Sequence, residues 1–118
     1  VPSQAYRKAA SYPNRGLIYE QNVDELKRIF NKKFPSRLAA LDKFLSTALL
    51  TLELVPTPSD EMTAESLIRD VKDRPILRAA IEAQADVLLT GDKDFLESGV
   101  EHPAIMTPAE FVNTTFET

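Results

Sequence analysis

Four acidic side chains, Glu25, Asp73, Asp92 and Asp94, are the residues of this chain whose type and position best suit a chemical site. Carboxylates are the ligands that hard divalent cations such as Mg²⁺ prefer in proteins. Carboxylates held close together also repel one another and raise each other's pKa, and a bound cation relieves that repulsion. Because a cation lowers the pKa of its water and that water can attack a phosphodiester, the pattern indicates phosphate chemistry with Mg²⁺ or Mn²⁺.

Residues 69–96 predict how acids that are distant in sequence can meet. They predict a helix over residues 74–84 with Asp73 at its start, then a buried strand at residues 87–89 and a turn that carries the last two acids. In a parallel α/β layer, the carboxyl ends of strands and the amino ends of the following helices meet at one sheet edge, where ligands bind. We therefore expect these carboxylates to gather at one edge.

The remaining segments predict an alternation of strands and helices. Predicted strands lie at residues 17–19, 51–55, 87–89 and 104–106. Predicted helices begin at Asn22, Pro35, Arg74, Asp94 and Pro108, the last with Thr107 and Glu110 in capping-box positions. Residues 56–66 predict a polar loop. This order favours an α/β fold with a mostly parallel central sheet flanked by helices, in one domain over residues 1–118.

Each acid also has a structural explanation. Glu25 can complete a capping box, and Asp73 can cap the helix that follows it. Asp92 suits a Gly-Asp turn, and Asp94 can cap a short helix. Any one acid taken alone favours the structural interpretation, but the set favours a site, because Ser, Thr or Asn would serve as caps without the mutual repulsion.

The composition excludes several other classes of site. The chain has no cysteine, which removes disulfides, zinc–thiolate sites and cysteine nucleophiles. Its net charge of −4 argues against nucleic-acid binding through excess positive charge alone. No apolar run approaches the roughly 18 residues that a membrane helix needs, and no signal peptide is visible. We therefore expect a cytoplasmic protein without membrane contact.

Three motifs occur in a fixed order along the chain: DVKD at residues 70–73, ADVLLTGDKDFL at 85–96 and IMTPAEF at 105–111. This ordered set resembles the PIN domain family, in particular its prokaryotic toxin-like (VapC-like) group, over nearly the whole chain. The resemblance implies a metal-dependent ribonuclease with a four-acid site. By matching position, Glu25, Asp73 and Asp92 would be three of these acids, and Asp94 would share or replace the role of Asp92.

The resemblance also implies a first aspartate on an N-terminal strand at the centre of the sheet. No residue before Ser3 can supply that acid. We therefore expect that the chain lacks about one strand and turn of the natural protein, including the first aspartate.

The resemblance further implies partners: an RNA substrate, a cognate antitoxin that silences the toxin near its acidic site, and a second copy of the chain in a homodimer. A basic cluster near Glu25 can contact an RNA backbone or form a solvated helix face. It consists of Lys27, Arg28, Lys32, Lys33 and Arg37. Two other functions stay open: a catalytically inactive PIN-fold module that binds RNA or protein, and a small magnesium-dependent phosphohydrolase that uses the turn at residues 91–94.

Overall fold

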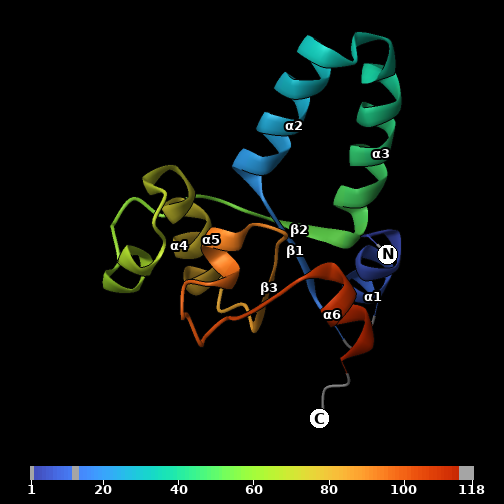
Figure 1. Cartoon of the computed structure of the whole chain (residues 1–118). Helices are drawn as coiled ribbons and strands as arrows, with labels where there is room; N and C mark the ends of the chain where they lie inside the picture. Colours follow the sequence, from blue (N-terminus) through green and yellow to red (C-terminus); the bar gives the residue numbers. More distant parts are fainter. Residues whose placement is uncertain (1, 12–13, 115–118) are drawn as a thin grey trace. The chain divides into compact units, whose positions relative to one another are not determined.

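The computed structural model describes residues 2–11 and 14–114 of the chain (Figure 1). The chain divides into two compact units, Ala9–Thr57 and Val1–Lys8 with Pro58–Thr118. Each unit contains one pair of parallel strands and its own helices. Within the described ranges, every helix is too short or too polar to cross a membrane.

The unit Ala9–Thr57 is a pair of parallel strands connected by a helical hairpin (Figure 1). Its elements in chain order are β1 (Gly16–Tyr19), α2 (Glu20–Lys33), the 3₁₀ turn η1 (Pro35–Arg37), α3 (Leu38–Thr51) and β2 (Leu52–Val55). In the strand pair, Ile18 lies opposite Leu54. A parallel pair needs a crossover connection, and α2 and α3 supply it.

The core of this unit lies between its helices. Val23 of α2 packs with Leu41 and Leu45 of α3, and all three are buried. The apolar spacing that predicts a helix after Pro35 is confirmed, because this spacing places the buried residues of α3 on one face. The predicted start at Asn22 is wrong: the chain passes from β1 directly into α2 at Glu20.

The unit Val1–Lys8 with Pro58–Thr118 holds the second parallel pair. It contains the first part of α1 (Pro2–Ala10), followed by η2 (Thr63–Leu67), η3 (Val71–Asp73), α4 (Arg74–Glu82), β3 (Val87–Leu89), α5 (Lys93–Leu96), β4 (Ala104–Met106) and α6 (Pro108–Asn113). Leu88 of β3 lies opposite Ile105 of β4. Since the two strands are parallel, the turn after β3 and the start of α6 follow the same edge of this pair.

The core of this second unit is a cluster of three buried side chains, Ile68, Leu77 and Phe95. Ile68 and Leu77 have no exposed surface. Leu77 comes from α4 and Phe95 from α5, and Leu88 and Ile105 of the strand pair pack against them. The two helices that carry the acidic motifs are thus held against the sheet by apolar burial, the dominant favourable contribution to folding.

Most predicted elements are confirmed. The α/β class and the parallel pairing agree with the structure, and Thr107 and Glu110 form the expected capping box at α6. The strands pair as two two-stranded sheets within the described residues, in place of one central sheet. The predicted polar loop of residues 56–66 is only partly a loop, since its last residues belong to η2. Within this turn Glu65 is buried and bound to Arg78 of α4.

Candidate functional site

Three aspartates, Asp70, Asp73 and Asp94, form a carboxylate cluster in the second unit. Each offers one carboxylate oxygen, and these oxygens all lie within 4.8 Å of one another. Asp70 is exposed, whereas Asp73 and Asp94 are half-buried. The members come from the junction of η3 with α4 and from the first turn of α5.

The start of α4 places Asp70 and Asp73. Asp70 is the N-cap of η3, and its Oδ1 accepts a hydrogen bond from the backbone N–H of Lys72 at 3.0 Å. Asp73 occupies the N-cap position of α4, but its side chain accepts no capping hydrogen bond. The interpretation of Asp73 as a capping side chain is therefore wrong, and its carboxylate belongs to the cluster instead.

The turn after β3 places Asp94. Asp92 is the N-cap of α5, since its Oδ1 accepts a hydrogen bond from the backbone N–H of Asp94 at 2.9 Å. The N–H of Asp92 in turn donates to Thr90 Oγ1 at 3.0 Å. The interpretation of Asp94 as the helix cap is thus wrong, because Asp92 has that position. Asp94 lies in the first turn of α5, with its carboxylate in the cluster.

The cluster is electrostatically strained at Asp73. Partial burial raises the pKa of Asp73, and the nearby carboxylates of Asp70, Asp92 and Asp94 raise this pKa further. The ion pair of Asp94 with Arg69 partly offsets the repulsion, since Arg69 Nη2 donates to Asp94 Oδ1 at 2.6 Å. Because the Arg69 side chain is 74% exposed, water weakens this pair.

The donor set fits a hard divalent cation. Magnesium binds oxygen ligands at about 2.0–2.1 Å, so ligands on opposite sides of the ion lie about 4.2 Å apart. This is the largest spacing between two ligands of one ion, and the cluster oxygens all lie within 4.8 Å of one another, a limit of the same order. Three carboxylates and no thiol or imidazole are also the ligand chemistry that such ions prefer.

The structure brings together two of the four predicted site residues, Asp73 and Asp94, and adds Asp70, which the sequence interpretation missed. The sequence contains a signal for Asp70: it lies three positions before Asp73 at a helix start, and residues at this spacing in a helical turn lie on the same side. Asp92 lies outside the cluster but close enough to raise the pKa of Asp73. Glu25 is an exposed residue of α2 in the other unit, away from any helix cap, and its place in a site stays a prediction.

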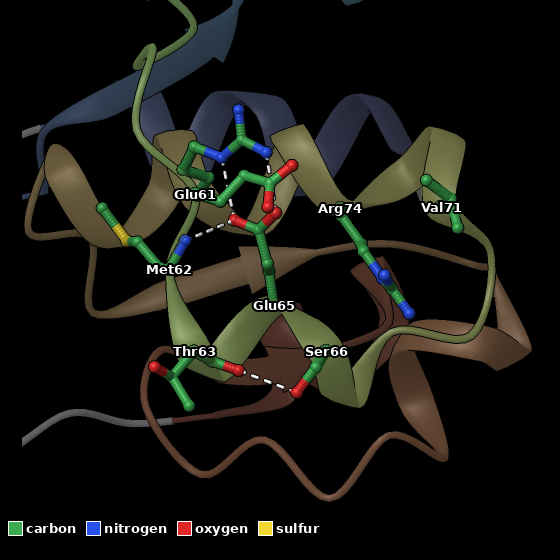
Figure 2. Close-up of a pocket in the computed structure, with 8 residues that line it drawn as sticks. Glu61, Met62, Thr63, Glu65, Ser66, Val71 and Arg74 are labelled. Atoms are coloured by element: carbon green, nitrogen blue, oxygen red, sulfur yellow. Dashed lines mark hydrogen bonds and ion pairs between the residues drawn. The ribbon is translucent and has the colours of Figure 1, made fainter.

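A pocket of about 240 Å³ is lined in part by the same segment (Figure 2). Its lining residues are Glu61, Met62, Thr63, Glu65, Ser66, Val71, Arg74 and Arg78. They come from η2 and the residues before it, from η3 and from α4. The pocket therefore contains both arginines and carboxylates, together with two hydroxyl groups and two apolar side chains.

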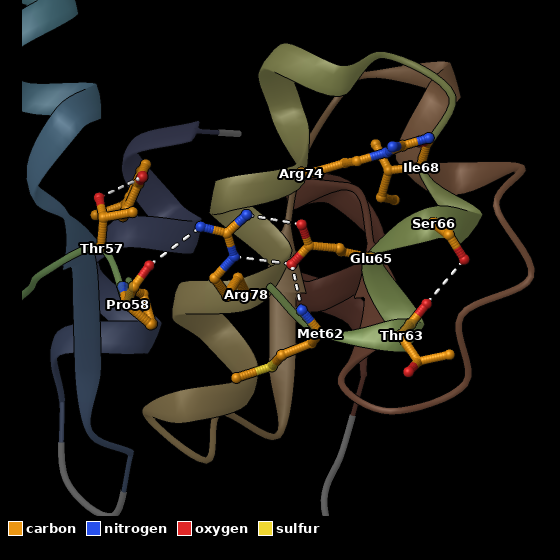
Figure 3. A network of polar contacts seen from close by, with 10 residues as sticks. Thr57, Pro58, Met62, Thr63, Glu65, Ser66, Ile68, Arg74 and Arg78 are labelled. Carbon is orange, nitrogen blue, oxygen red and sulfur yellow. Dashed lines mark hydrogen bonds and ion pairs between the residues drawn. The ribbon is translucent and has the colours of Figure 1, made fainter. Parts of the chain in front are cut away.

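A buried ion pair joins the wall of this pocket to α4 (Figure 3). Arg78 Nε and Nη2 donate to the two carboxylate oxygens of Glu65 at 2.8 and 2.7 Å. The N–H of Met62 donates to the same carboxylate, and Arg78 Nη1 donates to the carbonyl of Pro58. Mainly through the hydrogen bonds from Arg78, the pKa of Glu65 is lowered to about 2. The pair fixes the segment before η3 against α4.

Comparison with known proteins identifies the family. A model of the PIN domain family matches residues 4–94, which is more than half of the chain and includes all three members of the carboxylate cluster. No curated protein and no solved structure gives a significant match. The order of elements, the parallel strand pairs and the cluster agree with this match. The chain belongs to the PIN domain family.

Proposed function

We propose that this chain is a Mg²⁺- or Mn²⁺-dependent endoribonuclease that hydrolyses RNA phosphodiesters. PIN domains are generally nucleases, and they typically bind divalent metals. The observation that carries the proposal is the carboxylate cluster, because its three oxygens have the chemistry that a hard cation prefers and lie within 4.8 Å of one another. Hydrolysis adds water across one P–O bond of the backbone.

In this proposal Asp70, Asp73 and Asp94, each of which offers one carboxylate oxygen to the cluster, would hold the cation. When bound, Mg²⁺ or Mn²⁺ would offset the negative charge of the phosphodiester and lower the pKa of a water. Asp92 keeps the turn in place and completes the site next to Asp73. Glu25 is a further proposed ligand, supported by the sequence resemblance alone.

Exposed cations beside the cluster give the chain a way to attract RNA. Lys72 lies between Asp70 and Asp73, and Lys93 lies between Asp92 and Asp94; both lysines are exposed. Lysines beside an acidic site can hold the phosphates that flank the reacting one. The affinity for RNA that they contribute falls as the salt concentration rises. The net charge of −4 is compatible with this role because the acids of the site contribute to it.

The direct test is cleavage of a labelled single-stranded RNA with added Mn²⁺. Asp73→Asn should remove most of the cleavage, and a chelator should remove the same activity. Asp86→Asn is the matched control, since Asp86 is an exposed aspartate outside the cluster. Equal cleavage by the two variants would exclude Asp73 from the mechanism. Turnover of a phosphomonoester without RNA cleavage would favour a phosphohydrolase instead.

We extend the proposal to a toxin that acts in the cytoplasm, forms a homodimer and is silenced by an antitoxin. The sequence resemblance supports this role, and exposed apolar side chains support a partner surface. In the unit Ala9–Thr57 these are Leu26, Ile29, Phe34, Phe44, Leu49, Leu50 and Leu54. Induced expression of the wild type should arrest growth, and expression of Asp73→Asn should not.

Light scattering tests the homodimer. The wild type should have the mass of two chains, and Leu50→Glu should lower the measured mass.

A further inference from the structure

The pocket and the carboxylate cluster share one short segment of the chain. Val71 lines the pocket, and it lies between Asp70 and Asp73 of the cluster. Arg74, which also lines the pocket, directly follows Asp73. The residues of η3 and the first residue of α4 thus contribute to both features, so the pocket and the cluster are neighbours along this segment.

The two arginines of the pocket differ in their bonding. Arg78 is fully engaged with Glu65 and Pro58. Arg74 donates from Nε to the carbonyl of Ile68 at 2.9 Å. Its two Nη atoms have no hydrogen-bond partner in the part of the chain that the structure describes. Arg74 lines the pocket, and Figure 2 shows its side chain extending from the start of α4 away from the carboxylate of Glu65.

The bonding of Arg74 suits a phosphate. The bond from Nε to a backbone carbonyl fixes one edge of the guanidinium, and the half-buried stem limits its rotamers. Arginine presents N–H donors in a rigid fork that matches the oxygens of a phosphate. The free edge of Arg74 is therefore a preorganised donor group.

The other lining groups suit a small polar ring. The volume of about 240 Å³ is smaller than the roughly 300–1,000 Å³ of pockets for drug-sized ligands. Met62 and Val71 supply apolar surface, and methionine sulfur makes favourable contacts with aromatic rings. Ser66 donates its hydroxyl proton to the carbonyl of Thr63 at 2.8 Å, so its oxygen can accept a further bond, as can the exposed carboxylate of Glu61.

We propose that this pocket is a nucleotide subsite for single-stranded RNA, beside the phosphate that reaches the carboxylate cluster. Arg74 holds the phosphate of the bound nucleotide, and the base lies against the apolar surface of the lining, which on the Arg74 side is Val71 (Figure 2). The RNA must be single-stranded at this point, since a base can enter a pocket only when it is unstacked and unpaired. The subsite rests on the proposed function and adds a binding site for the substrate.

The first test measures binding of each of the four nucleoside 5′-monophosphates by calorimetry, with a chelator present so that no metal contributes. Arg74→Gln should lower the affinity for the nucleotide that binds most tightly by about tenfold, which is the loss expected for a charge-assisted hydrogen bond. Arg7→Gln is the matched control, because Arg7 is an exposed arginine of α1 that does not line the pocket. Equal affinities of the two variants would overturn the role of Arg74.

A second pair of variants tests the pocket without changing charge. Ser66→Phe places a ring in the pocket and should weaken nucleotide binding by about tenfold or more. Ala64→Phe adds the same ring to the same 3₁₀ turn at an exposed position that does not line the pocket, and should leave the affinity unchanged. Circular dichroism establishes that each variant is folded. Equal affinities of the two folded variants would exclude the pocket as the binding site.

The subsite and the nuclease proposal can fail separately. If Asp73→Asn loses RNA cleavage while Arg74→Gln and Ser66→Phe bind nucleotides like their controls, the subsite is wrong and the nuclease proposal stands. If the nucleotides bind to the wild type and the pocket variants bind them more weakly, the subsite stands even when the protein does not cleave RNA in Mn²⁺. Amide chemical shifts in the nuclear magnetic resonance spectrum give an independent readout: nucleotide addition should shift Met62, Ser66 and Arg74, and shifts confined to other residues would contradict the subsite.

Discussion

The carboxylate of Asp92 accepts a hydrogen bond from the backbone N–H of Asp94, with 2.9 Å between Oδ1 and N. Asp92 is thereby the N-cap of α5, while the carboxylate of Asp94 lies in the cluster with Asp70 and Asp73. Two aspartates of one turn therefore have different partners. Their spacing in the sequence does not distinguish them, because either could cap the helix and either could bind a cation.

Asp92→Ala should lower the free energy of unfolding by about 1 kcal/mol, since loss of an N-cap side chain typically costs about 0.5–2 kcal/mol. Asp92→Ser should retain most of this stability, because a serine hydroxyl can accept the same bond from the N–H of Asp94. Urea unfolding of both variants measures the difference. If Ser is as destabilising as Ala, the contribution of Asp92 to stability does not come from capping.

Asp70→Asn should weaken Mn²⁺ binding by at least about tenfold, because even groups that only support a metal ligand typically contribute 10–100-fold to affinity. Titration calorimetry of the chain provides the measurement. Asp86→Asn, which removes an exposed carboxylate outside the cluster, is the control. Since Asp70 is the residue that sequence interpretation missed, equal affinities of the two variants would favour a site without it.

Without divalent cations, Asp73→Asn should be more stable than the wild type at neutral pH. Burial and the nearby carboxylates raise the native pKa of Asp73 above the ordinary aspartate value of 3.8, so the native state binds this proton more tightly than the unfolded state. The free energy of unfolding of the wild type therefore falls as pH rises from about 3.8 through the native pKa, and it stays lower at neutral pH. Asparagine has no such dependence.

Thermal unfolding with a chelator at neutral pH tests this prediction. Addition of Mn²⁺ should reverse the order, because a cation that binds the native state stabilises the wild type more than the variant. A lower melting temperature of Asp73→Asn in the chelator would contradict the expected relief of repulsion and would make the Asp73 carboxylate a structural group.

Breaking the buried pair of Glu65 and Arg78 should be strongly destabilising. The two side chains are only 6% and 11% exposed, so Glu65→Gln leaves a buried arginine without its counter-charge, and loss of one partner of such a pair costs about 3–5 kcal/mol. Glu53→Gln removes the counter-charge from the exposed Arg15, whose side chain is 71% exposed, and should have a much smaller effect. Urea unfolding at neutral pH compares the two variants.

The effect of Glu65 should also depend on pH. Its native pKa is about 2, below the ordinary glutamate value of 4.5, so the native state releases the proton more readily than the unfolded state. The stabilisation is present above about pH 4.5 and is lost as pH falls toward about 2. The stability difference between wild type and Glu65→Gln should therefore shrink over that interval. If this stability difference did not change with pH, the charge of Glu65 would contribute nothing to the free energy of unfolding.

The elements with strong local signals could be predicted from the sequence. The apolar runs of β3 and β4 and the Thr107 capping box of α6 are encoded within a few neighbouring residues, and the structure has all three where expected. Parallel pairing of the strands then follows from their alternation with helices. Since the sequence predicts where such elements begin and end, it also predicts that Asp73, Asp92 and Asp94 lie near their ends.

Contacts between distant residues could not be predicted in this way. Glu65 is a polar residue in a polar segment, and only Arg78, thirteen positions later, makes it a buried group. The capping interpretations of Asp73 and Asp94 fail because backbone geometry at the helix starts decides which side chain reaches an N–H. Glu25 fails as a cap because α2 begins before Asn22.

Arg69 should compete with a divalent cation for Asp94. Its Nη2 lies 2.6 Å from Asp94 Oδ1, but the arginine side chain is 74% exposed, and such surface pairs contribute only about 0–1 kcal/mol to stability. Arg69→Gln should therefore change the free energy of unfolding little. It should tighten Mn²⁺ binding, because it frees a cluster carboxylate and removes a neighbouring positive charge.

Calorimetry of Arg69→Gln against Lys93→Gln separates these two causes. Lys93 is an exposed cation next to Asp94 in sequence, and its removal changes the net charge equally without freeing a cluster oxygen. We expect Arg69→Gln to tighten Mn²⁺ binding more than Lys93→Gln, and the excess should persist at high salt, where long-range charge effects are screened. Weaker binding by Arg69→Gln would reverse the conclusion, because Arg69 would then hold Asp94 in the orientation that the cation requires.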